Sequence, residues 1–363
     1  MRNRTIAAAC AAATVIALCA MTIPASASDD NRYKLTRLVS DKPIAEHQDP
    51  NLVNAWGLVA GPQTPWWVAN NGTDTSTLYD GNGTPLPLVV KVPGAPTGTV
   101  YNGGPGFVVS HKGESGPSLF LFAGEAGTIR GWNPAVPSPA PSTKAFTVVD
   151  MSSQDAIFKG LAIATTAAGG RLYATDFHNG RVDVFDENFD PVHVPGAFQD
   201  PNLPAGYGPF GIQTIGNEVF VTYAKQDADA EDDVAGAGFG YVDHYSLSGT
   251  LLGRVASGGA LNAPWGLAWA PEGFGGFAGG DLLIGNFGDG RINVYDRESD
   301  GDFELDGAIE RRNGNDMAID GLWALQFGNG NIAGPETTLF FTAGPNDESH
   351  GLFGKIEFAP EHD

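Results

Sequence analysis

The sequence predicts an all-β fold, a six-bladed β-propeller built from one repeated unit. A glycine- and aromatic-marked turn followed by short apolar runs recurs six times, at spacings of 49 to 58 residues, near the roughly 40–50-residue period of propeller blades. Glycine contributes 50 of 363 residues, which suits a chain of strands and turns. No long apolar stripe of helical period follows the N-terminal segment. The six recurrences are Trp56-Gly57-Leu58, Gly106-Phe107-Val108, Gly160-Leu161-Ala162, Phe210-Gly211-Ile212, Trp265-Gly266-Leu267 and Trp323-Ala324-Leu325.

Each unit contains three apolar runs that we interpret as the first three strands of a blade, counted outward from the axis. Pairs such as Asn179-Gly180 and Asp289-Gly290 separate these runs, and tight hairpin turns favour such pairs. The expected strands, in blade order, are 56–60, 65–69 and 76–79; 107–110, 118–123 and 127–132; 161–164, 171–175 and 181–185; 210–213, 218–223 and 240–245; 265–270, 281–285 and 291–295; and 322–327, 338–343 and 355–358.

The sixth blade has no outermost strand at the C-terminal end of the chain. A spare apolar run over 33–39 precedes the first blade. We therefore predict that this N-terminal strand pairs with 355–358 and closes the ring. Closure would remove the exposed sheet edge that an open array of blades presents.

The first 27 residues have the composition of a secretory signal peptide. Arg2 and Arg4 precede an apolar stretch over 6–20, and Ala25-Ser26-Ala27 supplies the small residues of a cleavage site. We expect cleavage after Ala27, one propeller domain over 28–363, and a secreted, extracellular protein.

The expected mature chain is acidic and lacks cysteine. Cys10 and Cys19 both fall in the signal segment, which excludes disulfides and thiolate metal sites from the mature protein. The full chain carries a net charge of −22, and loss of Arg2 and Arg4 makes it −24. This charge argues against nucleic acid and anionic membranes as partners. We expect a monomer, without membrane insertion, whose partner is a small molecule, a glycan or a protein.

The chain resembles two groups of propellers. Gly180-Arg-Val-Asp-Val-Phe-Asp186 and Gly290-Arg-Ile-Asn-Val-Tyr-Asp296 are similar to the repeat ends of NHL-type six-bladed propellers. The closer resemblance is to a family of secreted bacterial propeller proteins known mainly as conserved hypothetical proteins, and it implies an exported propeller without an agreed activity. Its carrying segments span the mature chain and include Asn54-Ala-Trp-Gly-Leu58, Lys159-Gly-Leu-Ala162, Tyr223-Ala-Lys-Gln-Asp227, Leu261-Asn-Ala-Pro-Trp-Gly266, Asp320-Gly-Leu-Trp323 and His350-Gly-Leu-Phe-Gly354.

Polar residues gather where such propellers bind ligands, in the loops between second and third strands and in the segments that lead into the innermost strands. The alternative interpretation is turn formation, which favours the same Asn, Asp and Gly residues. Among the candidates, we expect His178, Lys225, Asp320 and His350 to converge at one end of the channel. The candidate ligand-binding residues are Asn54, Asn70, Asn102, Lys159, Asp176, His178, Lys225, Asn262, Asn286, Asp320 and His350.

These patterns say less about function than about fold, and they identify no catalytic residues. Our leading hypothesis is ligand or partner binding on this polar loop face. The alternative is a metal-dependent lactonase- or lyase-like extracellular enzyme, with fold analogy as its warrant. A calcium site is a further hypothesis, against the simpler interpretation of a solvated loop. Its carboxylates are Asp296, Glu298, Asp300 and Asp302.

Overall fold

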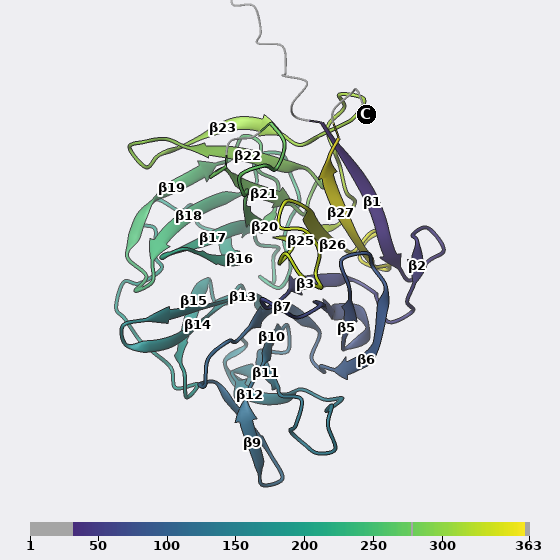
Figure 1. Ribbon diagram of the computed structural model, residues 1–363. Coiled ribbons are helices and arrows are strands. Elements are labelled where there is room, and N and C mark those ends of the chain that lie inside the picture. The colour runs from purple at the N-terminus through teal and green to yellow at the C-terminus, as the bar shows by residue number, and fades with distance from the viewer. Residues whose placement is uncertain (1–31, 277–278, 360–363) are drawn as a thin grey trace, which may run out of the picture.

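The computed structural model describes residues 32–276 and 279–359, so the expected signal peptide lies outside the described residues. Six antiparallel sheets stand around one axis as a β-propeller, with the innermost strand of each blade near the centre of Figure 1. The all-β, six-bladed prediction is therefore confirmed. Within the described residues, no helix is long and apolar enough to cross a membrane.

Five blades have four strands and the third has three. In order outward from the axis, the blades are β3 (Ala55–Val59), β4 (Trp66–Asn70), β5 (Thr75–Tyr79) and β6 (Pro85–Lys91); β7 (Pro96–Tyr101), β10 (Phe120–Gly124), β11 (Thr128–Trp132) and β12 (Phe146–Asp150); β13 (Phe158–Thr166), β14 (Gly169–Asp176) and β15 (Arg181–Asp186); β16 (Tyr207–Ile215), β17 (Glu218–Lys225), β18 (Tyr241–Ser246) and β19 (Leu251–Ser257); β20 (Pro264–Trp269), β21 (Leu282–Asn286), β22 (Ile292–Arg297) and β23 (Phe303–Ala308); and β25 (Leu322–Phe327), β26 (Leu339–Ala343), β27 (Leu352–Phe358) and β1 (Arg32–Ser40).

The N-terminal strand closes the ring, as predicted. β1 pairs antiparallel with β27 from Tyr33 opposite Phe358 to Ser40 opposite Leu352. Two short strands, β2 (His47–Gln48) and β24 (Glu310–Arg311), cover part of its outer edge in parallel. The first and last described strands of the chain thus lie side by side in one sheet (Figure 1).

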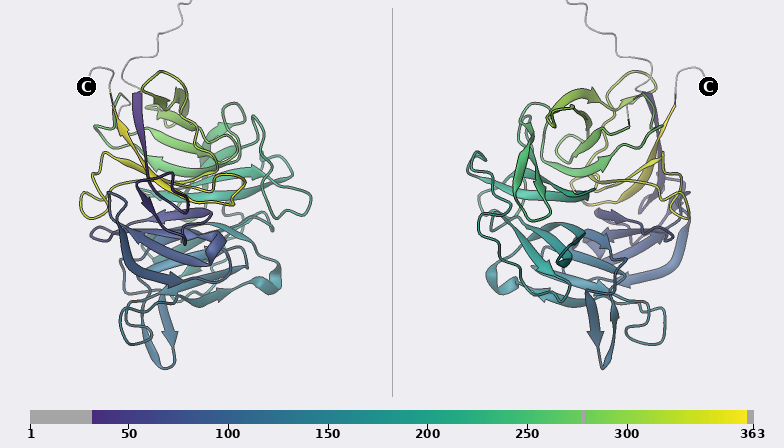
Figure 2. Two further views of the ribbon diagram at one scale, coloured as in Figure 1. Left: turned by 90° about the vertical axis from the view of Figure 1, so that its right-hand side faces the viewer. Right: turned by 60° about the vertical axis from the view of Figure 1, so that its left-hand side comes forward.

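The predicted innermost strand of the second blade is wrong. The run that starts at Phe107 begins a separate hairpin of β8 (Val108–His111) and β9 (Glu114–Pro117), which projects beyond the second blade in Figures 1 and 2. The true innermost strand is β7. Phe107 has a φ of +57°, which interrupts an extended strand, because non-glycine residues adopt this backbone conformation mainly in turns.

A close approach between blades explains the recurring glycine and shows where blade two begins. A Cβ on Gly57 would lie 2.4 Å from the Thr97 carbonyl oxygen, and one on Gly98 would lie 2.4 Å from the Leu161 amide nitrogen. Each such glycine therefore lets the next innermost strand pack directly against it. The motif in blade two is Thr97-Gly98-Thr99, which the aromatic signal does not detect.

In blades one, four, five and six, the residue before the recurring small residue is aromatic, and its side chain fills the axis. Trp56 of blade one stacks on Trp323 of blade six, with ring centroids 3.6 Å apart. It also meets Trp265 of blade five edge-on at 6.0 Å and Phe210 of blade four at 6.4 Å. Because side chains from four blades meet there, the ring has an aromatic core on its axis at this level. The polar loop end of the axis lies beyond this aromatic core.

Candidate functional site

The loop end of the axis carries a cluster of polar side chains that we call the channel mouth. Five of the six blades contribute to it, mostly through loops between second and third strands. Its members are Asn54, Asn71, Glu125, Lys159, Asp232, Asp233 and Glu348.

Lys159 is the centre of the cluster. It precedes Gly160 at the start of β13, so it occupies the position that an aromatic ring holds in four other blades. Its side chain is 1% exposed, and its Nζ donates to Glu125 Oε1 at 2.5 Å and to Asp232 Oδ1 at 3.1 Å. Burial alone lowers the pKa of Lys159, but the two carboxylates outweigh it and hold the pKa above its ordinary value. The ammonium group is thus charged at neutral pH.

Asn54 joins the aromatic core to the acidic loops. Its φ of +47° turns the chain just before β3, a conformation that asparagine tolerates better than most residues. Asn54 Nδ2 donates to Glu348 Oε2 at 2.5 Å, and Asn54 Oδ1 accepts from Trp323 Nε1 at 3.1 Å. Asn71 Nδ2 donates to Glu125 Oε2 at 2.8 Å, which completes a network across the mouth.

Two carboxyl groups of the mouth have raised pKa values. The pKa of Asp233 is raised to about 7: burial is the largest cause, Lys159 opposes it, and the neighbouring Glu348 and Asp232 add to it. Burial also raises the pKa of Glu348, and the hydrogen bond from Asn54 partly offsets this. Carboxyl groups that burial and like charges keep partly protonated are typical of functional sites.

Several buried polar atoms at this end have no partner in the described part of the chain. They are Asp233 Oδ2 and the indole nitrogens of Trp56 and Trp265. A buried donor or acceptor that bonds to nothing in the protein costs stability and requires an explanation such as water or a ligand. The mouth therefore offers both unused acceptors and unused donors.

Two of the sequence-predicted residues, Asn54 and Lys159, meet in this cluster. Three others serve their own turns. Asn70 Nδ2 donates to Thr75 and Thr77, Asn286 Nδ2 donates to Ala260 O and Asp289, and Asp176 accepts from Ile157 N and Asn179 while pairing with Arg181.

Two more of the predicted residues, Asn262 and Asn102, hold loops in place. Asn262 Oδ1 accepts from Gly236 N at 2.7 Å, which ties the loop of blade four to blade five. Asn102 follows β7 and donates to the carbonyls of Gly106 and Ser118. It therefore lies at the end of the innermost strand away from the channel mouth.

The four groups expected to converge lie apart in their contacts. His350 Nδ1 lies 3.0 Å from Asp41 Oδ2, beyond the end of the closing strand. Lys225 Nζ lies over the ring of Phe239 at 4.1 Å. Asp320 is exposed and accepts from Asn346 N. His178 is half-buried, and its Nδ1 has no partner. No contact joins any two of the four within the described residues, and their role in binding stays a prediction.

The sequence reasoning missed the acidic half of the mouth. Asp232 and Asp233 belong to the acidic insert 227–233 of blade four. Glu125 lies in a short glycine-flanked loop of blade two, where a turn alone explains the residue types. Their common signal is position, because each lies between the second and third strand of its blade.

The proposed calcium ligands lie on the turn between β22 and β23. Glu298 N donates to Asp302 O at 2.9 Å, and Asp302 N donates to Asp300 Oδ1 at 3.2 Å. Across residues 32–276 and 279–359, no three or more His, Cys, Asp or Glu side chains are grouped to hold one metal ion. Calcium binding here stays a prediction, which melting curves with and without EGTA test.

Comparisons with known proteins find relatives without a described activity. The chain is 36% identical over 343 residues to an uncharacterised protein of Acanthamoeba polyphaga mimivirus, covering 89% of this chain and 80% of that protein. It is 34% identical to a second uncharacterised protein of the same virus, with 89% and 85% covered. These relatives are viral, whereas the sequence resemblance suggested a bacterial family. No protein-family profile matches the chain.

Solved structures agree on the fold alone. An inactive virginiamycin B lyase from Staphylococcus aureus, solved with quinupristin, aligns with a TM-score of 0.50 at 13% identity, over 90% of this chain and 100% of that chain. A PQQ-bound aldose sugar dehydrogenase from Streptomyces coelicolor aligns with a TM-score of 0.50 at 14% identity, over 90% and 98%. At such identity the likeness extends to the propeller and not to its chemistry.

Proposed function

The chain belongs to one family with these two uncharacterised mimivirus proteins, and we propose that it is a secreted protein that binds a small organic cation at its channel mouth. The observation that carries the proposal is the charge balance around Lys159. Four carboxyl groups, from Glu125, Asp232, Asp233 and Glu348, face a single ammonium group. Lys159 engages two of them, and within the described residues the other two form no ion pair with a cation.

The surroundings suit a cationic ligand of the amine or guanidinium type. Carboxylates beside aromatic faces attract such groups by charge and by cation–π contact. Lys159 itself illustrates the geometry, since its Nζ lies 5.2 Å from the centroid of the Trp56 ring. The unpartnered indole nitrogens of Trp56 and Trp265 would donate to a hydroxyl or carbonyl elsewhere on the ligand.

Thermal stabilisation by small cations tests the proposal, with a neutral sugar as the control. Thermal denaturation is measured with glucosamine, agmatine and choline, and with glucose as the neutral counterpart of glucosamine. We expect at least one cation to raise the melting temperature, because a ligand stabilises the state that binds it. Asp233→Asn should weaken that cation about tenfold or more, since hydrogen bonds to charged groups are the strong ones. Equal stabilisation by glucose, or none by any cation, would contradict the proposal.

Proton release gives an independent readout. A cation beside Asp233 favours its charged form and lowers its pKa from about 7. Binding near pH 7 should therefore release protons, and the calorimetric enthalpy should differ between phosphate and Tris buffers. In Asp233→Asn this difference should shrink. The same enthalpy in both buffers would place the ligand elsewhere.

A second candidate function is acid–base catalysis by a hydrolase or lyase. Asp233 favours it, because a carboxyl group with a pKa of about 7 can both accept and donate a proton near neutral pH. Activity is assayed on a panel of lactones and esters with and without added Zn²⁺, Mg²⁺ or Ca²⁺. Turnover that Asp233→Asn abolishes, with melting temperature unchanged, would favour the enzyme over the binding protein.

Export and a monomeric state complete the proposal. The signal-like segment before residue 28 supports export, and the net charge of −22 supports a protein that stays apart from nucleic acid. N-terminal sequencing of the protein from culture medium should begin at Ser28. Size-exclusion chromatography with light scattering should return the mass of one chain.

A further inference from the structure

The third blade lacks the fourth strand that the other five blades have. The segment after β15 starts as such a strand: Val192 N donates to Val184 O at 2.8 Å and Asp186 N donates to Asp190 O at 2.9 Å. It then turns away, and Phe198 N donates to Gly249 O of blade four. Only one end of the outer edge of β15 is therefore covered.

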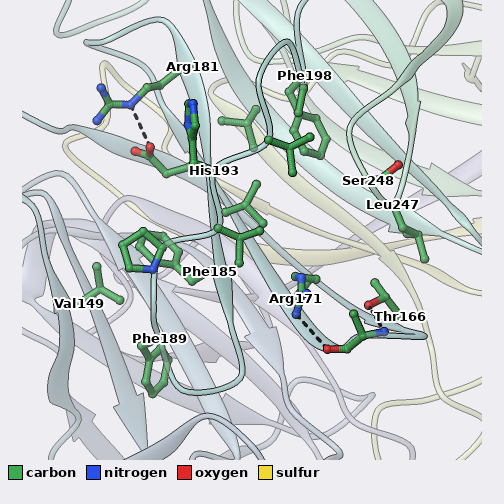
Figure 3. A pocket seen from close by; sticks show the side chains of 18 of the residues that line it. Val149, Thr166, Arg171, Arg181, Phe185, Phe189, His193, Phe198, Leu247 and Ser248 are labelled. Carbon is green, nitrogen blue, oxygen red and sulfur yellow. Dashed lines mark hydrogen bonds and ion pairs between the residues drawn. The ribbon is translucent and has the colours of Figure 1, made fainter.

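A groove of about 1180 Å³ lies where the rest of that strand would run. Its walls come from three consecutive blades, as Figure 3 shows, with Val149 of blade two on one side and Leu247 of blade four on the other. The rings of Phe185, Phe189 and Phe198 line it. Both sides of β15 thus present apolar surface.

The open end of β15 has backbone groups that pair with nothing. Val184 directs its carbonyl oxygen toward the returning segment, so Val182, two residues away, directs its N–H and C=O to the same edge. Neither of these groups has a hydrogen-bond partner in the described residues. An uncovered strand edge of this kind is a template for another strand.

The groove also contains a cation without an acidic partner in the described part of the chain. The Arg171 guanidinium donates only to the carbonyls of Gly170 at 2.8 Å and Ala168 at 3.4 Å. Arg181, by contrast, pairs with Asp176 and Asp183. The two arginines lie at opposite ends of the groove in Figure 3. In a chain of net charge −22, an arginine without an acidic partner in the described residues offers a site for a carboxylate from outside.

We propose that this groove binds an extended peptide segment of a partner protein, which adds to the open end of β15 as the missing fourth strand. Its backbone pairs with Val182, its alternate apolar side chains pack toward blades two and four, and an acidic side chain pairs with Arg171. Strand addition to an exposed edge gives affinity through main-chain hydrogen bonds and specificity through side-chain pockets. This site is separate from the channel mouth.

A phage library of random dodecapeptides tests the proposal against the immobilised protein. We expect enriched peptides to alternate apolar residues and to carry an Asp or Glu. A synthetic copy of one peptide should bind about tenfold or more weakly to Val182→Pro, because proline removes the edge N–H while edge strands tolerate it. Arg171→Gln should weaken the acidic peptide and not its Asp→Asn or Glu→Gln form. Leu305→Thr, a change of an exposed residue on β23 of blade five, should bind as wild type does.

N-methylation of alternate residues of the peptide provides a test on the wild-type protein, so that misfolding of a variant cannot affect the result. The methylated peptide keeps its side chains and loses outward N–H donors, so its affinity should fall about tenfold or more. The proposal is overturned if no peptide sequence is enriched. It is also overturned if the enriched peptide binds equally well after N-methylation, since the groove would then recognise side chains or a small apolar molecule without strand pairing.

Discussion

At the scale of single residues, small size matters more than chemistry in the recurring motif. The glycines of the innermost strands lie against the backbone of the next blade, and a Cβ on Gly211 would lie 2.1 Å from the Trp265 carbonyl oxygen. The residue before each glycine is freer to vary. It is Trp, Phe, Thr or Lys in different blades, and this variation places a buried ammonium group beside four aromatic side chains.

Substitution of one such glycine should therefore be costly. Gly211→Ala should lower the free energy of unfolding by about 2–3 kcal/mol, because backbone cannot move aside for the new methyl group. Gly104→Ala is the matched control, since its Cβ would meet nothing closer than Asn102 Oδ1 at 3.4 Å, and it should change stability by less than about 0.5 kcal/mol. Urea denaturation followed by tryptophan fluorescence measures both. Equal costs would show that the close approach does not limit this position.

At the scale of elements, the closing strand decides whether the ring is complete. Tyr33 in β1 is 1% exposed, packs on Phe274 at 4.7 Å, and donates its hydroxyl to the Phe274 carbonyl at 2.9 Å. Its neighbour Lys34 is exposed on the other face of the same strand. The strand thus offers a buried and an exposed side chain in adjacent positions.

Tyr33→Ala should lower the free energy of unfolding by about 3–4 kcal/mol, as for other buried aromatic truncations, whereas Lys34→Ala should stay within about 0.5 kcal/mol of wild type. Deletion of residues 28–40 should go further and cause aggregation, because it exposes the edge of β27. Melting curves and light scattering check both expectations. A monomeric deletion variant with an unchanged melting temperature would refute closure by β1.

The sequence predicted elements better than it predicted the site. Five innermost strands and the closing strand follow from local patterns of apolar residues and turns. The prediction of the innermost strand in the second blade was wrong because Thr97-Gly98-Thr99 has no aromatic marker. Only the contact of Gly98 with Leu161 of the next blade reveals the role of this segment. The acidic residues of the channel mouth were not predicted for a related reason. Glu125, Asp232 and Glu348 are far apart in sequence, and ring geometry alone brings them around Lys159.

At the scale of the whole molecule, acidity and burial act together on stability. Burial raises the pKa of several carboxyl groups in different blades, among them Asp183 to about 6, Asp233 to about 7 and Asp281 to about 6. Between pH about 4 and these values, the native state binds more protons at these groups than the unfolded state does. Each contribution to stability is therefore present at low pH and is lost as pH rises through the native pKa.

The melting temperature should accordingly fall as pH rises from 5 to 8, and repulsion within a chain of net charge −22 acts in the same direction. Asp233→Asn should flatten part of this slope, because its side chain no longer titrates. Asp150→Asn is the control, since hydrogen bonds from Ser152 lower the pKa of Asp150 and its titration falls below this range. A melting temperature that rises from pH 5 to 8 would contradict the burial of these acids.

Ring closure also sets the order in which the protein can be finished during synthesis. The partner of β1 is β27, which begins at Leu352, so the strand made first must wait for the strand made last. Blades one to five can each assemble from contiguous chain as it emerges, while the sixth stays incomplete until β27 has been synthesised. A nascent chain that stops before Leu352 would therefore leave two unpaired segments at once, one at each end. Protease sensitivity at β1 during synthesis would reveal that interval.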